Sequence, residues 1–144
     1  MMTLWEHISA LKTAYDRFTN DVCKKYGLAH REFDILIYLN DYPDENTATD
    51  IVRKLNLSKS HVSVSLRALE ERGLVIGEFA GGNRRTIYLK MTPSASQIVA
   101  DGLEARELFA RTMLDGFSEG EISVFLDALG RVKKNVMSYA KSHK

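Results

Sequence analysis

The chain has 144 residues, a length typical of one domain, and its 44% hydrophobic content is enough to bury a core without disulfides or metals. Its 20 basic and 19 acidic residues give a formal net charge of +1, so no global basic field points to a nucleic-acid partner. The single cysteine excludes an intramolecular disulfide, and the low proline and glycine content excludes collagen-like and wholly disordered chains.

The sequence contains no pattern typical of a membrane span or an export signal. The longest stretch without a charged residue, Met91–Ala100, has ten residues and is too short to cross a bilayer. The N-terminus lacks the basic start and the apolar run of a secretory signal. We therefore expect a cytoplasmic protein with no membrane partner.

Two helices are expected in the first 45 residues. Apolar side chains recur every three or four positions between residues 4 and 26, which predicts an amphipathic helix that Gly27 ends. A second helix is expected over residues 32–40, where Phe33 and Leu36 supply part of the buried side. A turn-rich stretch follows it.

A close pair of helices comes next. Asn46 or Thr47 can cap the third helix, and Ser58 is a good N-cap for the fourth. The fourth helix should run for about fifteen residues and end at a glycine. Its inner face is predicted to consist of Val62, Leu66 and Leu69.

The pattern then changes to a β-hairpin followed by two long helices. Residues 74–80 and 86–91 read as short strands around a glycine-rich tip. Thr92 is expected to cap the next helix, over residues 94–115, with Pro93 in its first turn. Ser118 and Glu121 form a capping box that opens the last helix.

The order helix, turn, helix, hairpin is that of a winged helix-turn-helix, in which the second helix of the pair enters a major groove. With the apolar trio inward, the outward side chains are short, polar or cationic, with one valine, and such groups can contact base edges, a thymine methyl or phosphate. The DNA-binding candidates on this helix are Ser58, Lys59, Ser60, His61, Ser63, Val64 and Arg67. Those on the hairpin tip, which could approach a minor groove, are Asn83, Arg84 and Arg85.

Residues 28–95 resemble the MarR family of bacterial transcription regulators. The resemblance is carried by an ordered series of segments, with no gap from Ser58 to Thr92: residues 50–52 (DIV), 57–63 (LSKSHVS), 69–75 (LEERGLV), 83–85 (NRR) and 91–92 (MT). The sequence departs from the family pattern in having Asn83 for the acidic residue of the wing, Val64 for a frequent arginine, and Gly77 for a frequent basic residue. These departures concern the strength of DNA binding and the operator sequence rather than the fold.

The predicted fold class is therefore mainly α with a small β-hairpin wing (α+β), a winged helix-turn-helix with N- and C-terminal dimerisation helices. We expect a dimerisation helix over 1–27, a DNA-binding domain over 28–92 and dimerisation helices over 93–144. The resemblance implies a homodimer acting as a repressor on double-stranded DNA with a pseudo-palindromic operator, since a two-fold dimer presents two recognition helices to successive major grooves.

The resemblance also implies a small aromatic ligand, phenolic or anionic, bound between the dimer helices and the winged helix, which would weaken DNA binding by population shift. Candidate pocket residues are polar or adaptable groups on helices expected to meet there. They are His7, Tyr15, Arg17, Tyr38 and Met113.

Alternative functions follow from individual residues. The departures at Asn83, Val64 and Gly77 leave open a winged-helix protein-interaction module that has lost DNA binding. Cys23 could be a thiol redox sensor, although a small buried residue is the better interpretation. The four histidines show no metal-ligand spacing, and no catalytic motif occurs, so we expect neither a metal, a cofactor nor an enzyme.

Charge is distributed unevenly along the chain. Residues 1–45 hold five basic and eight acidic side chains (−3), residues 46–92 eight and four (+4), and residues 93–144 seven of each (zero). The net +1 is thus an average in which the positive part coincides with the predicted helix-turn-helix and wing. The excess is modest, so binding should depend on dimer geometry as much as on charge.

Overall fold

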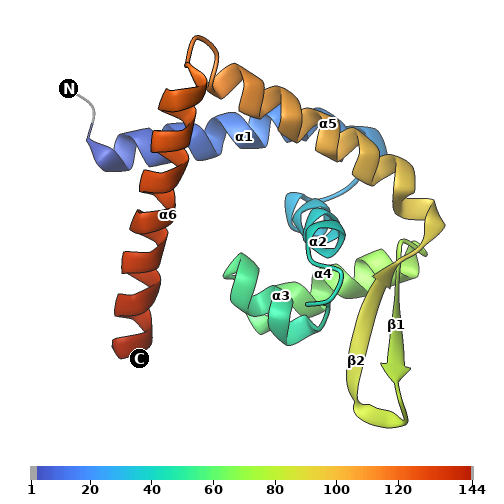
Figure 1. Ribbon diagram of the computed structural model, residues 1–144. Coiled ribbons are helices and arrows are strands. Elements are labelled where there is room, and N and C mark those ends of the chain that lie inside the picture. Colours follow the sequence, from blue (N-terminus) through green and yellow to red (C-terminus); the bar gives the residue numbers. More distant parts are fainter. Residues whose placement is uncertain (1–2, 144) are drawn as a thin grey trace. The chain divides into compact units, whose positions relative to one another are not determined.

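The computed structural model describes residues 3–143. Within that range it contains six α-helices, a short 3₁₀ turn and one two-stranded antiparallel sheet, which confirms the predicted mainly α fold with a hairpin wing (Figure 1). The chain divides into two compact units, Met1–Phe109 and Ala110–Lys144. The outer ends of the expected dimerisation segments, residues 1–2 and 144, lie outside the described residues.

The first helix, α1 (Leu4–Tyr26), begins at a Thr3–Glu6 capping box and ends at Gly27, whose φ of 63° is the left-handed conformation that glycine adopts readily. Its predicted apolar stripe is buried only towards the C-terminal end, where Val22 and Cys23 join the core. Leu4 near the other end is 65% exposed.

The core of the first unit lies among α2 (His30–Asp41), α3 (Ala48–Leu55) and α4 (Lys59–Glu71). Phe33, Leu36 and Ile51 are completely buried in it. Thr47 caps α3 through the amide of Asp50 and Ser58 caps α4 through the amide of His61, as the sequence predicted. Each such cap stabilises a helix by about 1 kcal/mol.

The hairpin consists of β1 (Val75–Ala80) and β2 (Asn83–Met91) and extends away from the helices (Figure 1). Its turn is Gly81-Gly82, with φ of 57° and 77°, the pair of positive values that a tight hairpin turn requires. The second strand begins three residues before the predicted start at residue 86, because the arginine pair belongs to the strand rather than to the tip.

After the hairpin, Pro93–Ala95 forms a 3₁₀ turn that leads into α5 (Ser96–Met113). Thr92 occupies the predicted N-cap position, with Pro93 in the first turn, but its side chain makes no capping hydrogen bond. Its hydroxyl instead donates a hydrogen bond to the carbonyl of Gly73, at 2.5 Å, and the Thr92 amide donates to the carbonyl of Leu74. Thr92 therefore joins the end of β2 to the segment after α4.

Helix α5 packs closely against α2. The Cα of Gly102 lies over Phe33 and Ile37, so near that a Cβ there would come within 2.7 Å of the Phe33 ring. Arg106 and Asp41 form a two-pronged ion pair, with N–O distances of 2.6 and 3.1 Å. The hydrogen bonds to Asp41 raise the pKa of the Arg106 guanidinium.

The second unit contains α6 (Glu119–Ser142), which begins at the predicted Ser118–Glu121 capping box. None of its 24 residues is buried. Many of its apolar side chains are about half exposed or more: Val124, Leu126, Leu129, Val132, Val136, Met137 and Tyr139. So wide an exposed apolar surface is typical of a helix face that packs against another surface.

Candidate nucleic-acid interface

The outward face of α4 is the first part of the candidate site. Val62, Leu66 and Leu69 are 1%, 7% and 0% exposed, so the predicted inner face is confirmed. All six candidates within the helix are exposed: Lys59, Ser60, His61, Ser63, Val64 and Arg67. The core thus holds α4 rigidly by one face and presents the other to solvent.

The start of α4 is suited to an anion. The Ser58 hydroxyl accepts the His61 amide at 3.1 Å and lies 3.2 Å from the Ser60 hydroxyl. No acidic residue occupies the first turn, so the positive end of the helix dipole is not neutralised there. Lys59 adds a charge at the same end, and together these groups favour a phosphate.

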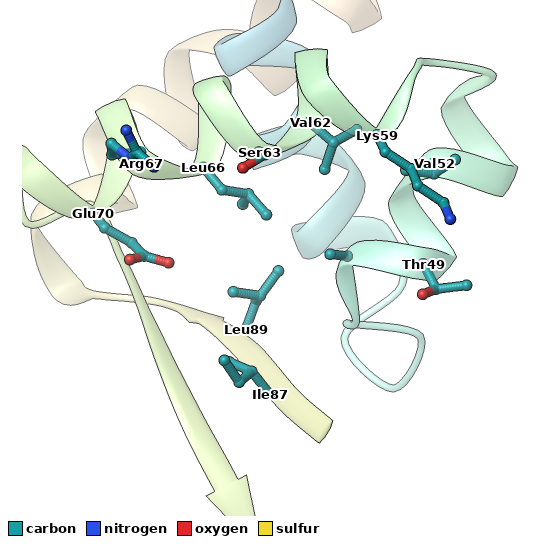
Figure 2. A pocket seen from close by; sticks show the side chains of 11 residues that line it. Thr49, Val52, Lys59, Val62, Ser63, Leu66, Arg67, Glu70, Ile87 and Leu89 are labelled. Carbon is teal, nitrogen blue, oxygen red and sulfur yellow. The ribbon is translucent and has the colours of Figure 1, made fainter. Parts of the chain in front are cut away.

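A hollow of about 540 Å³ lies between α3, α4 and β2. Figure 2 shows Leu66 of α4 and Leu89 of β2 pointing towards each other across it, with Ile87 further along the strand. Lys59, Ser63, Arg67 and Glu70 line its polar side. The recognition helix and the base of the wing therefore form one continuous surface.

The wing carries its arginines on an irregular segment of β2. Regular pairing runs from Val75–Met91 to Glu78–Tyr88, and the next pair is Ala80–Asn83, so β2 contributes more residues than β1 between these pairs. The Asn83 side-chain oxygen accepts the Arg85 amide at 2.9 Å. This local bond helps to fix the backbone that presents Arg84 and Arg85, both exposed.

One backbone hydrogen bond and one side-chain hydrogen bond, both between Asn46 and Leu89, fix the base of the wing. The Leu89 amide donates to the Asn46 carbonyl at 2.8 Å, and the Asn46 side-chain amide donates to the Leu89 carbonyl at 2.8 Å. Asn46 is only 8% exposed, so these bonds are shielded from water. The loop before α3 therefore holds β2 in place.

A second set of contacts connects α4 to the end of α1. The Arg72 guanidinium, just after α4, donates to the carbonyls of Tyr26 (2.5 Å) and Gly27 (3.2 Å). The Tyr26 hydroxyl donates to Asp101 of α5 at 2.6 Å, and Lys25 pairs with the same carboxylate at 3.0 Å. These bonds, that from Tyr26 first, lower the pKa of Asp101 to about 2.

Comparison with known proteins identifies the arrangement. The MarR family model matches residues 26–86, from the end of α1 to the middle of the wing. The HTH-type transcriptional regulator PecS of Dickeya dadantii (strain 3937) is 29% identical over 133 residues, covering 91% of this chain and 80% of PecS. Both sequence comparisons relate the chain to the MarR family, through the segment 26–86 and through its similarity to PecS.

Solved structures agree with this assignment over the whole chain. A Listeria monocytogenes regulator assigned to the MarR family, complexed with 26mer DNA, superposes with a TM-score of 0.86 at 25% identity, covering 100% of this chain and 97% of that one. MepR of S. aureus in complex with DNA shares the fold, with a TM-score of 0.79 at 18% identity over 93% of this chain and 96% of MepR. The chain is thus similar to MarR-family transcriptional regulators over its whole length, and these relatives are regulators rather than enzymes, in agreement with the prediction.

Two departures from the MarR pattern have structural reasons in this chain. Asn83 still accepts the Arg85 amide, which needs an oxygen but no charge. Gly77 pairs with Leu89 in the hairpin, and a Cβ at Gly77 would lie 2.7 Å from the Cγ2 of the nearby Ile87. A basic side chain at position 77 would force Ile87 to shift, and glycine avoids this contact.

The predicted pocket residues of the first unit, which are His7, Tyr15, Arg17 and Tyr38, have different surroundings. Arg17 lines a hollow along α1 with Phe18 and Glu6, whereas Tyr15 packs its ring against Phe109. Tyr38 is 3% exposed, and its hydroxyl donates a hydrogen bond to the Glu45 carbonyl. His7 is exposed on α1, and Met113 is half-buried at the end of α5 in the second unit.

Cys23 has the surroundings of an inert thiol. It is 3% exposed, and its Sγ lies 3.7 Å from the Nδ1 of His30. Burial, followed by the charge of Asp34, raises the pKa of Cys23 to about 11. The neighbouring lysines do not lower it, and the Lys25 ammonium is paired with Asp101 instead.

Two further observations bear on the predicted classes of site. Within residues 3–143, no three His, Cys, Asp or Glu side chains gather where they could hold a metal ion. No helix in this range is both long and apolar enough to cross a membrane.

Proposed function

We propose that this chain is a sequence-specific DNA-binding repressor that acts as a homodimer on a pseudo-palindromic operator. The observation that carries the proposal is the outward face of α4: six exposed side chains on a helix whose other face is sealed into the core, beside a wing bearing two exposed arginines. The DNA complexes of the Listeria monocytogenes regulator and of MepR support it.

Each part of the interface has a distinct role in this proposal. Ser60, His61, Ser63, Val64 and Arg67 face the bases in the major groove, while Ser58 and Lys59 hold a phosphate at the start of the helix. Arg84 and Arg85 reach the adjacent minor groove from a thin glycine turn, where narrow grooves attract arginine.

Dimerisation is proposed for the exposed apolar surfaces of α1 and α6. Leu4, Trp5 and Ile8 on α1 are 65%, 74% and 48% exposed, and α6 has no buried residue. Covering these faces with a second copy would remove them from water and place two α4 helices about one turn of DNA apart. The segments 1–27 and 93–144 are accordingly the proposed dimerisation segments, and 28–92 the DNA-binding domain.

We further propose that a small-molecule ligand relieves repression. A small phenolic or anionic aromatic molecule would bind near the dimer helices and shift the spacing of the recognition helices. Arg17 beside Phe18 in the hollow along α1 offers a cation and a ring for such a molecule. A regulator with the same fold, at 20% identity, has been solved in its 2,4-dichlorophenol bound form.

The test begins with selection of the DNA fragments that the purified protein retains, followed by titration of the selected operator at several salt concentrations. Arg67→Ala and Arg85→Ala should each weaken binding. Lys59→Ala, which removes a proposed phosphate contact, should reduce the salt slope by about one per subunit. The matched control is Arg31→Ala, an exposed arginine of α2 outside the proposed interface, which should leave both quantities unchanged.

Two results would contradict the proposal. If neither Arg67→Ala nor Arg85→Ala changed the affinity or its salt slope, the assigned contacts would be wrong. If no DNA were retained even at low salt, the chain would be better described as a winged-helix interaction module.

A further inference from the structure

Val64 is the one large apolar side chain of α4 that the core leaves outside, among residues that the structure describes. It is 68% exposed, whereas Val62, Leu66 and Leu69 of the same helix are at most 7% exposed. It is also more exposed than the apolar side chains of the wing, of which Phe79 is 54% exposed. Packing within the chain therefore gives no reason for a valine here.

A valine at this position also does nothing for the helix. Branching at Cβ restricts its side-chain rotamers in a helix, so alanine or a long polar residue would stabilise α4 more. Val64 lies at the centre of the outward face, four residues after Ser60 and three before Arg67, spacings that place all three on one side of the helix. An isolated apolar group is thus framed by polar groups where the proposed interface meets the bases.

We propose that Val64 contacts the C5-methyl group of a thymine at one fixed position in each half-site. The inference rests on the proposed DNA binding and adds a specificity determinant to it. In the major groove only the thymine methyl offers an apolar contact, and a small branched side chain without donors or acceptors suits it.

The position of Arg67 fixes where this thymine should be. Three residues of helix advance by roughly 4.5 Å, close to the rise of one base-pair step of about 3.4 Å. Arginine prefers the O6 and N7 of guanine. The thymine that Val64 contacts should therefore lie next to a guanine, or one base-pair step further from it. Replacing that guanine should weaken binding of the wild type but not of a variant that lacks Arg67.

The experiment replaces thymine by uracil, which removes the methyl group and keeps every hydrogen-bonding group. Each thymine of the selected operator is replaced in turn, symmetrically in both half-sites, and the affinity is measured for the wild type, Val64→Ala and Val64→Thr. Removal of one methyl contact should weaken wild-type binding about fourfold per half-site, hence about fifteenfold in both. The effect should occur at one symmetric position.

The variants show whether Val64 is responsible. Val64→Ala should bind the thymine and uracil operators equally, with an affinity near that of the wild type for the uracil operator. Val64→Thr keeps one methyl group in the same shape and should retain part of the discrimination. Neither change removes a buried contact. The free energy of unfolding of both variants should therefore lie within about 0.5 kcal/mol of the wild-type value.

The outcomes separate this inference from the function on which it rests. A sequence-specific complex that is indifferent to uracil at every position, or equally sensitive with Val64→Ala, would overturn the inference alone. Failure to retain any specific DNA would overturn the proposed function and the inference together.

Discussion

Replacement of Gly102 by alanine tests the packing that positions the winged helix against α5. The added methyl would lie 2.7 and 2.9 Å from two atoms of the Phe33 ring and 2.9 Å from the Cδ1 of Ile37. Both neighbours belong to the core, and Phe33 is completely buried, so neither side chain can swing into solvent. The helices must move apart, or the side chains must leave their preferred rotamers.

Two opposing effects set the size of the change. Overpacking a well-filled core costs about 1–3 kcal/mol. Replacing glycine by alanine within a helix stabilises it by about 1 kcal/mol. The sum is a loss of about 1 kcal/mol in the free energy of unfolding, which corresponds to a fall of about 4 °C in Tm for a chain of this size.

Urea denaturation at a fixed protomer concentration measures this change, with Gly120→Ala as the matched control. Gly120 is also helical, but a Cβ there would meet nothing closer than the Ser118 Oγ at 3.9 Å. The control should unfold at the wild-type midpoint or above it. The reasoning is refuted if Gly102→Ala is as stable as Gly120→Ala, because the close contact between α5 and α2 would then carry no energetic cost.

Three further predictions concern single side chains. Alkylation of Cys23 by iodoacetamide at neutral pH should be at least about 100-fold slower in the folded protein than in urea, because its pKa of about 11 leaves little thiolate; equal rates would restore the redox-sensor alternative. Arg72→Ala should lower the free energy of unfolding by about 1 kcal/mol through loss of the bonds to Tyr26 and Gly27, with Arg72→Lys intermediate; a wild-type urea midpoint would show that these bonds contribute nothing. Asn83→Ala should weaken operator binding without changing the unfolding midpoint, whereas Asn83→Asp, which keeps the acceptor for the Arg85 amide, should retain more affinity; equal losses would argue against that role.

The features predicted correctly from the sequence were local ones. The caps at Thr47, Ser58 and Ser118 and the left-handed glycine after α1 depend on residues within one turn, and the structure has all of them. The inner face of α4 followed from its period alone. Such features can be predicted from the sequence because the capping residue and the backbone group that it caps lie within a few residues of each other.

The contacts that hold the site together were not predictable in this way. Arg72 bonds carbonyls 45 and 46 residues away, and Asn46 bonds a carbonyl 43 residues away, and no local pattern marks either pairing. The side-chain partner of Thr92 was not predictable for the same reason. Its hydroxyl donates a hydrogen bond to the distant Gly73 carbonyl instead of capping the helix. The contacts of Tyr15 with Phe109 and of Tyr38 with the Glu45 carbonyl were likewise not marked by any local pattern.

The departures from the family pattern also needed the structure for their interpretation. From the sequence, Gly77 and Asn83 raised the question of weakened DNA binding. Their surroundings explain them otherwise, because Ile87 fills the space beside Gly77 and the Asn83 oxygen fixes the backbone of the wing. Of these three departures, only Val64 has no explanation within the chain, and the proposed contact with a thymine methyl supplies one.

The central claim is that two recognition helices, held by one dimer, read two half-sites. The most direct measurement compares the affinity of the protein for its selected operator with that for the same DNA lengthened by about five base pairs between the half-sites, half a helical turn. We expect the lengthened DNA to bind about 10³-fold more weakly or worse, at the nonspecific level. An unchanged affinity would contradict the account.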